Sequence, residues 1–207
     1  MTDPHLIRTE DELRTILPEP HAMLEQKVFD HVDSFAAEFI AKSPLILLAT
    51  TGKDGGLDVS PKGDAAGFVW VEDEKTIWLP ERPGNKLAYG FRNMLSNPQV
   101  GVIFVIPGVT ETLRVNGKAE ISRDPAILEK LSAQNKPAIL ATRITVGESF
   151  FHCGKAFIRS KLWKADTWPK DAKPKIGKQI AARAKLGDEV ATSIDDAMEA
   201  DYKTGLY

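Results

Sequence analysis

Residues 111–121 read ETLRVNGKAEI, and polar and apolar side chains alternate along this stretch. Successive side chains of a β-strand point to opposite faces of a sheet, so the alternation predicts a strand with one apolar face and one polar, partly basic face. The apolar face carries Leu113, Val115, Gly117 and Ala119, and the polar face carries Thr112, Arg114, Asn116 and Lys118. This pattern is typical of an antiparallel sheet that packs on a core through one face.

Short runs rich in Val, Ile, Leu and Trp occur on both sides of this strand and are separated by turn residues. They predict further strands over residues 44–51, 57–60, 67–71, 75–79, 99–106 and 138–146. The turns are short, so neighbouring strands form hairpins and the sheet is antiparallel. Six or so such strands with few helices predict a mainly β protein with peripheral helices (α+β), built as a small barrel or sandwich.

Helical patterns lie mostly outside the strands. Residues 22–41 place apolar side chains at helical spacing and predict one amphipathic helix that ends before Ser43-Pro44. Shorter helices are predicted over residues 86–95 and 125–133, and a charged helical tail over residues 176–200. The chain is therefore expected to form a single domain, residues 1–207. It divides into an N-terminal helical region, a β core and a C-terminal helical tail, at residues 1–41, 42–168 and 169–207.

Composition narrows the classes of function. Hydrophobic residues make up 43% and charged residues 27% of the chain, which is the balance of a folded protein. A formal net charge of -2 gives no general attraction for nucleic acid or anionic lipid, so neither partner is expected and a small anionic ligand is favoured. Cys153 is the only cysteine, and no signal peptide or membrane-spanning run is recognised, so a cytoplasmic setting is expected.

The best candidate for an anion site is the segment Arg82-Pro83-Gly84-Asn85-Lys86, between a predicted strand and a predicted helix. Gly84 allows close backbone approach, Asn85 can cap the helix, and the free N–H groups of the first turn can join Arg82 and Lys86 around a phosphate. The alternative is an ordinary strand-to-helix turn with solvated charges.

Two further segments carry candidate binding residues. Ser60-Pro61-Lys62-Gly63-Asp64 offers a hydroxyl, a cation and a flexible glycine after a strand, although such residues also fill solvated turns. Thr112 and Arg114 share the polar strand face described above. An inward-pointing arginine there needs an acidic side chain or an anionic ligand, whereas a solvent-exposed sheet face needs neither.

Residues 150–163 combine aromatic side chains, an imidazole, a thiol and several cations. His152 and Cys153 are adjacent and cannot readily chelate one ion together, and the other histidines offer no zinc-type spacing, so no metal site is expected. A buried thiol and a structural imidazole are the simpler interpretation of the pair. The usual dinucleotide-fold, P-loop, hydrolase and metalloprotease motifs are absent from the sequence.

Taken in order, these segments resemble the pyridoxamine 5'-phosphate oxidase-related FMN-binding proteins over about residues 20 to 170. The resemblance is carried by Ser43-Pro44-Leu45, Ser60-Pro61-Lys62-Gly63-Asp64, Leu79 to Lys86, Arg92-Asn93-Met94-Leu95, Ile106-Pro107-Gly108, Glu111 to Gly117, and His152 to Trp163. It implies a six-stranded antiparallel FMN-binding split barrel that forms a homodimer, with FMN held in clefts at the subunit interface.

The resemblance also implies roles for individual residues. Arg82, Asn85 and Lys86 match the flavin-phosphate clamp, and Ser60, Lys62 and Gly63 match the strand along the isoalloxazine and ribityl chain. Lys62 is the candidate for the charge beside the reduced ring. Thr112 and Arg114 match contacts from a neighbouring strand, of the same or the other subunit, and Arg159 with Trp163 matches residues that close the cofactor site.

The sequence departs from the true pyridoxamine 5'-phosphate oxidases in two places. Their Arg-x-x-x-Leu-Lys-type flavin strand is replaced by Ser60-Pro61-Lys62-Gly63-Asp64, and their C-terminal Arg-x-His segment has no counterpart in residues 164–207. The expected function is thus an FMN-dependent oxidoreductase of unknown substrate, with no catalytic residue singled out. The alternatives are a non-catalytic FMN carrier or sensor, a deazaflavin- or haem-binding relative on the same barrel, and a structural dimer with an empty cleft.

Overall fold

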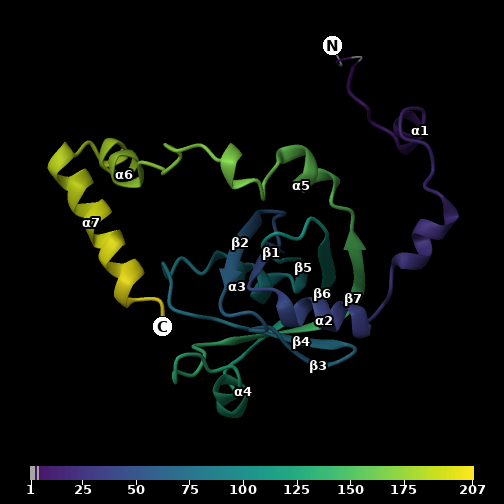
Figure 1. Ribbon diagram of the computed structural model, residues 1–207, viewed down its shortest axis with the longest axis horizontal. Helices are drawn as coiled ribbons and strands as arrows, with labels where there is room; N and C mark the ends of the chain where they lie inside the picture. Colours follow the sequence, from purple (N-terminus) through teal and green to yellow (C-terminus); the bar gives the residue numbers. More distant parts are fainter. Residues whose placement is uncertain (1–2, 4) are drawn as a thin grey trace.

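A computed structural model describes residue 3 and residues 5–207 of the protein, which forms one antiparallel sheet of seven strands with helices around it (Figure 1). The strand order is β2-β1-β5-β6-β7-β4-β3. The strands are β1 Leu45–Thr51, β2 Leu57–Gly63, β3 Trp70–Asp73, β4 Thr76–Pro80, β5 Gln99–Val105, β6 Thr112–Ser122 and β7 Ala141–His152. The mainly β, α+β class is confirmed. The sheet differs from the expected six-stranded barrel because it has one strand more and does not close, β2 and β3 being its two edges.

The helices lie at the periphery of the sheet (Figure 1). They are α1 Glu10–Arg14, η1 Ala22–Lys27 (a 3-10 helix), α2 Ser34–Lys42, α3 Tyr89–Ser96, α4 Pro125–Lys130, α5 Lys155–Ser160, η2 Ala165–Thr167 (3-10), α6 Ile176–Ala184 and α7 Asp188–Thr204. No helix in the described part of the chain is both long and apolar enough to cross a membrane.

The prediction of one helix over residues 22–41 is wrong. A 3-10 turn ends at Lys27, and α2 begins only at Ser34, where Asp33 accepts a hydrogen bond from the backbone N–H of Ala36 at 2.7 Å. Between them the chain is extended, and Phe29 exchanges two backbone hydrogen bonds with Ser149 of β7, at 3.0 and 2.7 Å. Pairing with the sheet thus replaces the helix that the apolar spacing favoured.

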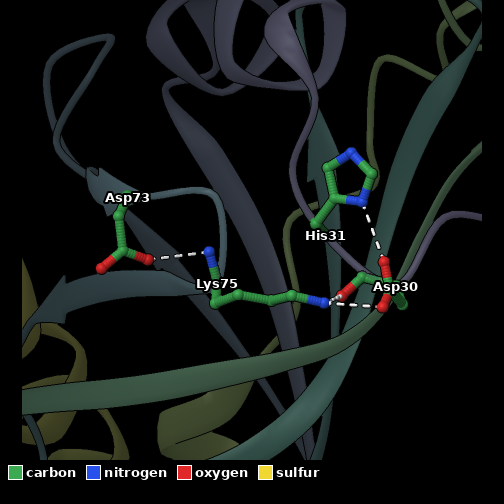
Figure 2. A network of polar contacts seen from close by, with 4 residues as sticks. All are labelled: Asp30, His31, Asp73 and Lys75. Carbon is green, nitrogen blue, oxygen red and sulfur yellow. Dashed lines mark hydrogen bonds and ion pairs between the residues drawn. The ribbon is translucent and has the colours of Figure 1, made fainter.

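Polar contacts fasten this extended segment to the β3–β4 turn (Figure 2). The ammonium group of Lys75 donates to the backbone oxygen of Asp30 at 2.6 Å and lies 2.8 Å from its carboxylate. Nδ1 of His31 lies 2.9 Å from the other carboxylate oxygen of Asp30, and Asp73 accepts from the backbone N–H of Lys75 at 2.8 Å. Hydrogen bonds from Lys75 and His31 and the charge of Lys75 lower the pKa of Asp30 to about 2.

Strand β7 is longer than the predicted strand over residues 138–146 and continues to His152, which pairs with Thr112. The register between β6 and β7 shifts at Asn116 and Gly117. Gly117 lies so close to β7 that a Cβ at this position would come within 2.2 Å of the carbonyl oxygen of Thr145. The bulge and Gly147 interrupt the alternation of apolar and polar side chains. The sequence prediction therefore ended this strand at residue 146 instead of His152.

The core lies on one face of the sheet and is covered by α2 and by α3, whose Met94 is buried in it. The predicted apolar face of β6 is confirmed, since Leu113, Val115 and Ala119 are buried. They pack with buried residues of the other strands and of α2, including Ile40, Ile46, Leu48, Ile77, Val102, Phe104 and Ile144.

The predicted tail forms two helices, α6 and α7, which pack against each other and stand away from the sheet (Figure 1). Gly177 lies against the backbone of Ala191, and its N–H donates to Asp195 at 2.9 Å. The break between the helices follows Lys185, whose φ of 57° is in the left-handed region. After α7 the chain returns to the body, where residues 206 and 207 reach a cavity.

Candidate functional site

A cavity of about 780 Å³ lies beside β2 and the segment that follows β4. Its walls are strand β2, the segment that joins β4 to α3, the first turn of α3, residues 139–140 and residues 206–207. This volume falls within the range of ligand pockets, roughly 300–1,000 Å³.

Six of the predicted cofactor residues line this cavity. They are Ser60, Lys62, Gly63, Arg82, Asn85 and Lys86. Ser60 and Lys62 pair in register with the buried residues Leu48 and Ile46 of β1, so their side chains lie on the core side of the sheet. The structure therefore brings together two segments that are separated in sequence.

The side chain of Arg82 is only 15% exposed. Its Nε donates to Oδ2 of Asp64 at 2.7 Å, and its Nη2 donates to the backbone oxygen of Leu131 at 2.9 Å. Its Nη1 is buried and has no hydrogen-bond partner among the described residues. An unsatisfied buried donor costs about 1–3 kcal/mol. Arg82 lines this cavity and also a second one, of about 540 Å³, beside Leu131.

Asp64 is 3% exposed, and its carboxylate binds both Arg82 and Tyr207. Its Oδ1 accepts hydrogen bonds from the Tyr207 hydroxyl at 2.7 Å and from the backbone N–H of Ala65 at 2.8 Å. Burial alone would raise the pKa of Asp64, but these hydrogen bonds and the one from Arg82 lower it below its usual value. Bonding to this carboxylate also raises the pKa of Tyr207.

Sequence reasoning missed the roles of Asp64 and Tyr207. Asp64 ends the segment Ser60-Pro61-Lys62-Gly63-Asp64 but has no partner predicted from sequence, and Tyr207 lies beyond the predicted helical tail of residues 176–200. The two residues are 143 positions apart, and no local pattern signals a contact at that separation.

Lys62 is ion-paired with Glu81, and both side chains are mostly buried. The Lys62 ammonium group also lies 5.5 Å from the centre of the Phe91 ring. Lys62 is the residue expected to place a charge beside the reduced ring. Its charge is offset by Glu81, a carboxylate to which the sequence assigned no role.

The predicted start of the helix at Lys86 is wrong. Helix α3 begins at Tyr89, after Lys86 and Ala88 adopt positive φ angles of 61° and 54°. Asn85 does not cap the helix and instead accepts a hydrogen bond from the N–H of Leu87 at 3.0 Å. No side chain caps α3, and Tyr89, Gly90 and Phe91 of its first turn line the cavity, so the uncapped helix start lies at Tyr89 and not at Lys86.

The other four predicted cofactor residues, Thr112, Arg114, Arg159 and Trp163, do not line this cavity. Thr112 is buried, and the Arg114 guanidinium lies 5.3 Å from the centre of the Phe150 ring. Arg159 is exposed on α5, and Trp163 donates through Nε1 to the backbone oxygen of Val109 at 2.8 Å.

Strand register explains why Arg114 does not line the cavity. Directly paired residues of an antiparallel sheet share a face, and one such row runs through Pro61, Leu47, Ile103, Arg114 and Phe150. Ser60 and Lys62 lie on the opposite face. The face that carries Arg114 continues at the β2 edge into Leu57 and Val59, which are 80% and 62% exposed.

The His152 and Cys153 pair shows no arrangement for metal binding. Burial and the charges of Arg114 and Lys27 lower the pKa of His152, and Cys153 is exposed rather than buried as expected. The described residues contain no group of three or more His, Cys, Asp or Glu side chains that could hold a metal ion.

Comparison with known proteins gives one family. The family model described as Pyridoxamine 5'-phosphate oxidase matches residues 32–153, more than half of the chain. No curated protein sequence matches.

Solved structures with a similar fold share little sequence with the chain. HupZ of Group A Streptococcus is 19% identical, with a TM-score of 0.48 over 58% of this chain and 93% of its own. A protein from Clostridium acetobutylicum, related to general stress protein 26 of the pyridoxinephosphate oxidase family, is 18% identical (TM-score 0.44; 57% and 85% covered). An FMN-binding protein from Syntrophomonas wolfei is 8% identical (TM-score 0.42; 56% and 87% covered).

Proposed function

The chain belongs to the pyridoxamine 5'-phosphate oxidase family, and on this basis we propose that it is a homodimeric oxidoreductase that binds FMN in the cavity beside Arg82. The substrate is a small molecule whose structure the cavity does not specify.

One observation carries the cofactor proposal. Nη1 of Arg82 is buried and unpaired among the described residues, while Nε and Nη2 of the same group are held by Asp64 and Leu131. A phosphate monoester supplies oxygen acceptors for such a donor, and charge-assisted hydrogen bonds of this kind are short and strong. The uncapped N-terminus of α3 and the exposed Lys86 add further donors for the same group.

The chain's own residues would bind and orient the cofactor. Arg82, Asn85 and Lys86 would hold the phosphate, while Ser60, Lys62 and Gly63 would lie along the remainder of the molecule. FMN supplies hydride or single-electron transfer through its ring when bound. Lys62, with Glu81 beside it, would set the charge next to that ring, and Leu206 and Tyr207 would limit the access of water.

The homodimer is supported by the exposed sheet face. Leu57 and Val59 expose apolar side chains on the same face as Arg114, and such a surface is a candidate for burial against another chain. A two-fold arrangement would allow Arg114, Arg159 and Trp163 to approach the cavity of the partner subunit, which they do not line in their own chain, whereas the buried Thr112 could only support Arg114 from the same strand.

The cofactor proposal is tested by an absorption spectrum of the purified protein and mass spectrometry of the molecule released on denaturation. FMN is expected in the wild type, and the Arg82→Ala, Lys86→Ala double variant should lose it. Lys178→Ala, which removes an exposed cation on α6, is the matched control and should keep it. Full retention of FMN by the double variant would refute the phosphate site.

The same measurements separate the alternatives. A carrier or sensor would release FMN but show no turnover with reduced nicotinamides or oxygen. A deazaflavin- or haem-binding protein would show a different spectrum and a different released mass. A structural dimer would be colourless, and its melting temperature would not respond to added FMN, whereas a true ligand raises it.

A further inference from the structure

The polar contacts described between the body of the protein and the segment that contains the α6–α7 hairpin are made at Tyr207. Among the described residues, every hydrogen bond or ion pair that joins residues 170–207 to earlier parts of the chain is made by Tyr207. Its hydroxyl donates to Asp64 at 2.7 Å, and its backbone oxygen accepts from the ammonium group of Lys136 at 2.6 Å. The hairpin otherwise stands apart from the sheet (Figure 1).

This attachment falls on the group that fixes Arg82. The Asp64 carboxylate bonds Tyr207 through Oδ1 and Arg82 through Oδ2, so the two side chains share one buried anion. The Tyr207 ring centre also lies 6.0 Å from Cζ of Arg82. Tyr207 therefore contacts Arg82 both through Asp64 and through its own ring.

Tyr207 therefore affects the direction in which Nη1 of Arg82 points. A guanidinium group is planar, so fixing Nε and Nη2 also fixes where Nη1 points. Asp64 can hold Nε in place only if its own carboxylate is held, and the Tyr207 hydroxyl is one of two donors to Oδ1. Without that hydroxyl the carboxylate can rotate, and Arg82 can rotate with it.

We propose that Tyr207 is a positioning residue for cofactor binding, which holds Asp64 so that Arg82 presents Nη1 to the phosphate group of the ligand. This inference rests on the proposed function of the cavity. It assigns the hairpin a role in recognition of the phosphate and not of the ring, and it makes a phosphate-specific prediction.

The test compares two ligands that differ only in the phosphate, FMN and riboflavin, by fluorescence titration of the stripped full-length protein. Tyr207→Phe removes the hydroxyl and keeps the ring. It is expected to raise the Kd for FMN roughly tenfold while leaving the Kd for riboflavin unchanged. In an Arg82→Ala background, the same substitution should have no further effect on FMN, because the group that it positions is absent.

Two further variants complete the design. Tyr202→Phe makes the same chemical change on the exposed face of α7 and should bind both ligands as the wild type does. Lys136→Ala removes the other anchor of Tyr207 and should also weaken FMN binding selectively. This second variant keeps the test valid if Tyr207→Phe does not fold, which a far-ultraviolet circular dichroism spectrum shows.

Each outcome has one meaning. If Tyr207→Phe weakens the binding of FMN and of riboflavin equally, Tyr207 only lines the cavity, and the inference is overturned. Unchanged affinity for FMN would overturn it as well and leave the proposed function intact. A wild type that binds neither ligand would overturn the proposed function and the inference together.

Discussion

Lys62 of β2 and Glu81, directly after β4, form an ion pair on the wall of the cavity. Arg82 is likewise paired with Asp64. Two of the three cations that line the cavity are therefore already neutralised by carboxylates, and Lys86 is the one that makes no ion pair with a described residue. The affinity of the cavity for an anion depends on this balance as well as on the number of cations.

Glu81→Gln is therefore expected to tighten FMN binding. The substitution keeps the size of the side chain, removes one negative charge and frees the Lys62 ammonium group for the ligand. A gain of about 1 kcal/mol, roughly a fivefold lower Kd, is expected for a partly buried pair of this kind. Isothermal titration calorimetry measures the effect, with Glu129→Gln on α4 as the exposed control. Weaker binding by Glu81→Gln would show that Glu81 orients Lys62 rather than neutralising it.

A cofactor site shared between subunits predicts complementation. Arg82→Ala, Lys86→Ala removes one half of the proposed site, and Arg114→Ala removes a residue of the half expected from the partner. Homodimers of either variant should lose FMN, whereas mixed dimers should keep one intact site of the two. FMN content per dimer, measured after co-expression with two affinity tags, gives the answer. Arg114→Ala homodimers with full FMN content would place Arg114 outside the site.

Val59→Glu is expected to weaken the proposed dimer. Val59 is largely exposed on the edge strand β2, and burying an unpaired carboxylate in an apolar interface is costly. The dimer dissociation constant should rise at least roughly tenfold, which is about 1.4 kcal/mol. Light scattering after size-exclusion chromatography over a dilution series measures it. Leu95→Glu, at a more exposed position on α3, is the control, and equal effects of both substitutions would argue against this face.

The fold class could be read from the sequence because one local signal determines it. The alternation along residues 111–121 appears in the structure as the buried row Leu113, Val115 and Ala119, since side-chain direction in a strand depends only on position parity. Helix boundaries were less predictable. Residues 22–41 have helical spacing, yet Phe29 pairs with β7, a tertiary interaction that local propensity does not contain.

The candidate site was predictable only in part, for the same reason. Arg82 and Lys86 stand in one segment whose composition suggests an anion site, and in the structure both line a cavity. The partners that fix Arg82 come from distant parts of the chain, Asp64 from the end of β2 and Leu131 from the end of α4. Tyr207 comes from beyond α7, and only the folded arrangement reveals these contacts.

Acid should destabilise the protein through Asp30, whose pKa of about 2 lies below the ordinary value of 3.8 (Figure 2). A lowered pKa means that the ionised group stabilises the folded state above about pH 4 and that this contribution is lost as the pH falls toward 2. The free energy of unfolding of the wild type should therefore approach that of Asp30→Asn between about pH 5 and about pH 2. Urea titrations across this range measure the difference, and Lys75→Met should remove most of it. A constant difference would contradict the assignment.

Gly117→Ala should destabilise the fold more than a typical surface substitution. A Cβ at this position would lie 2.2 Å from the carbonyl oxygen of Thr145 and 2.9 Å from the side chain of Ile144, so β6 and β7 would have to separate at the bulge. A loss of roughly 2 kcal/mol or more is expected, because backbone atoms cannot yield as a flexible side chain does. The urea midpoint should fall with an unchanged m-value. Gly56→Ala, where a Cβ meets no atom within 4 Å, should stay within about 0.5 kcal/mol of the wild type, and an equally small effect at Gly117 would show that the two strands can move apart without cost.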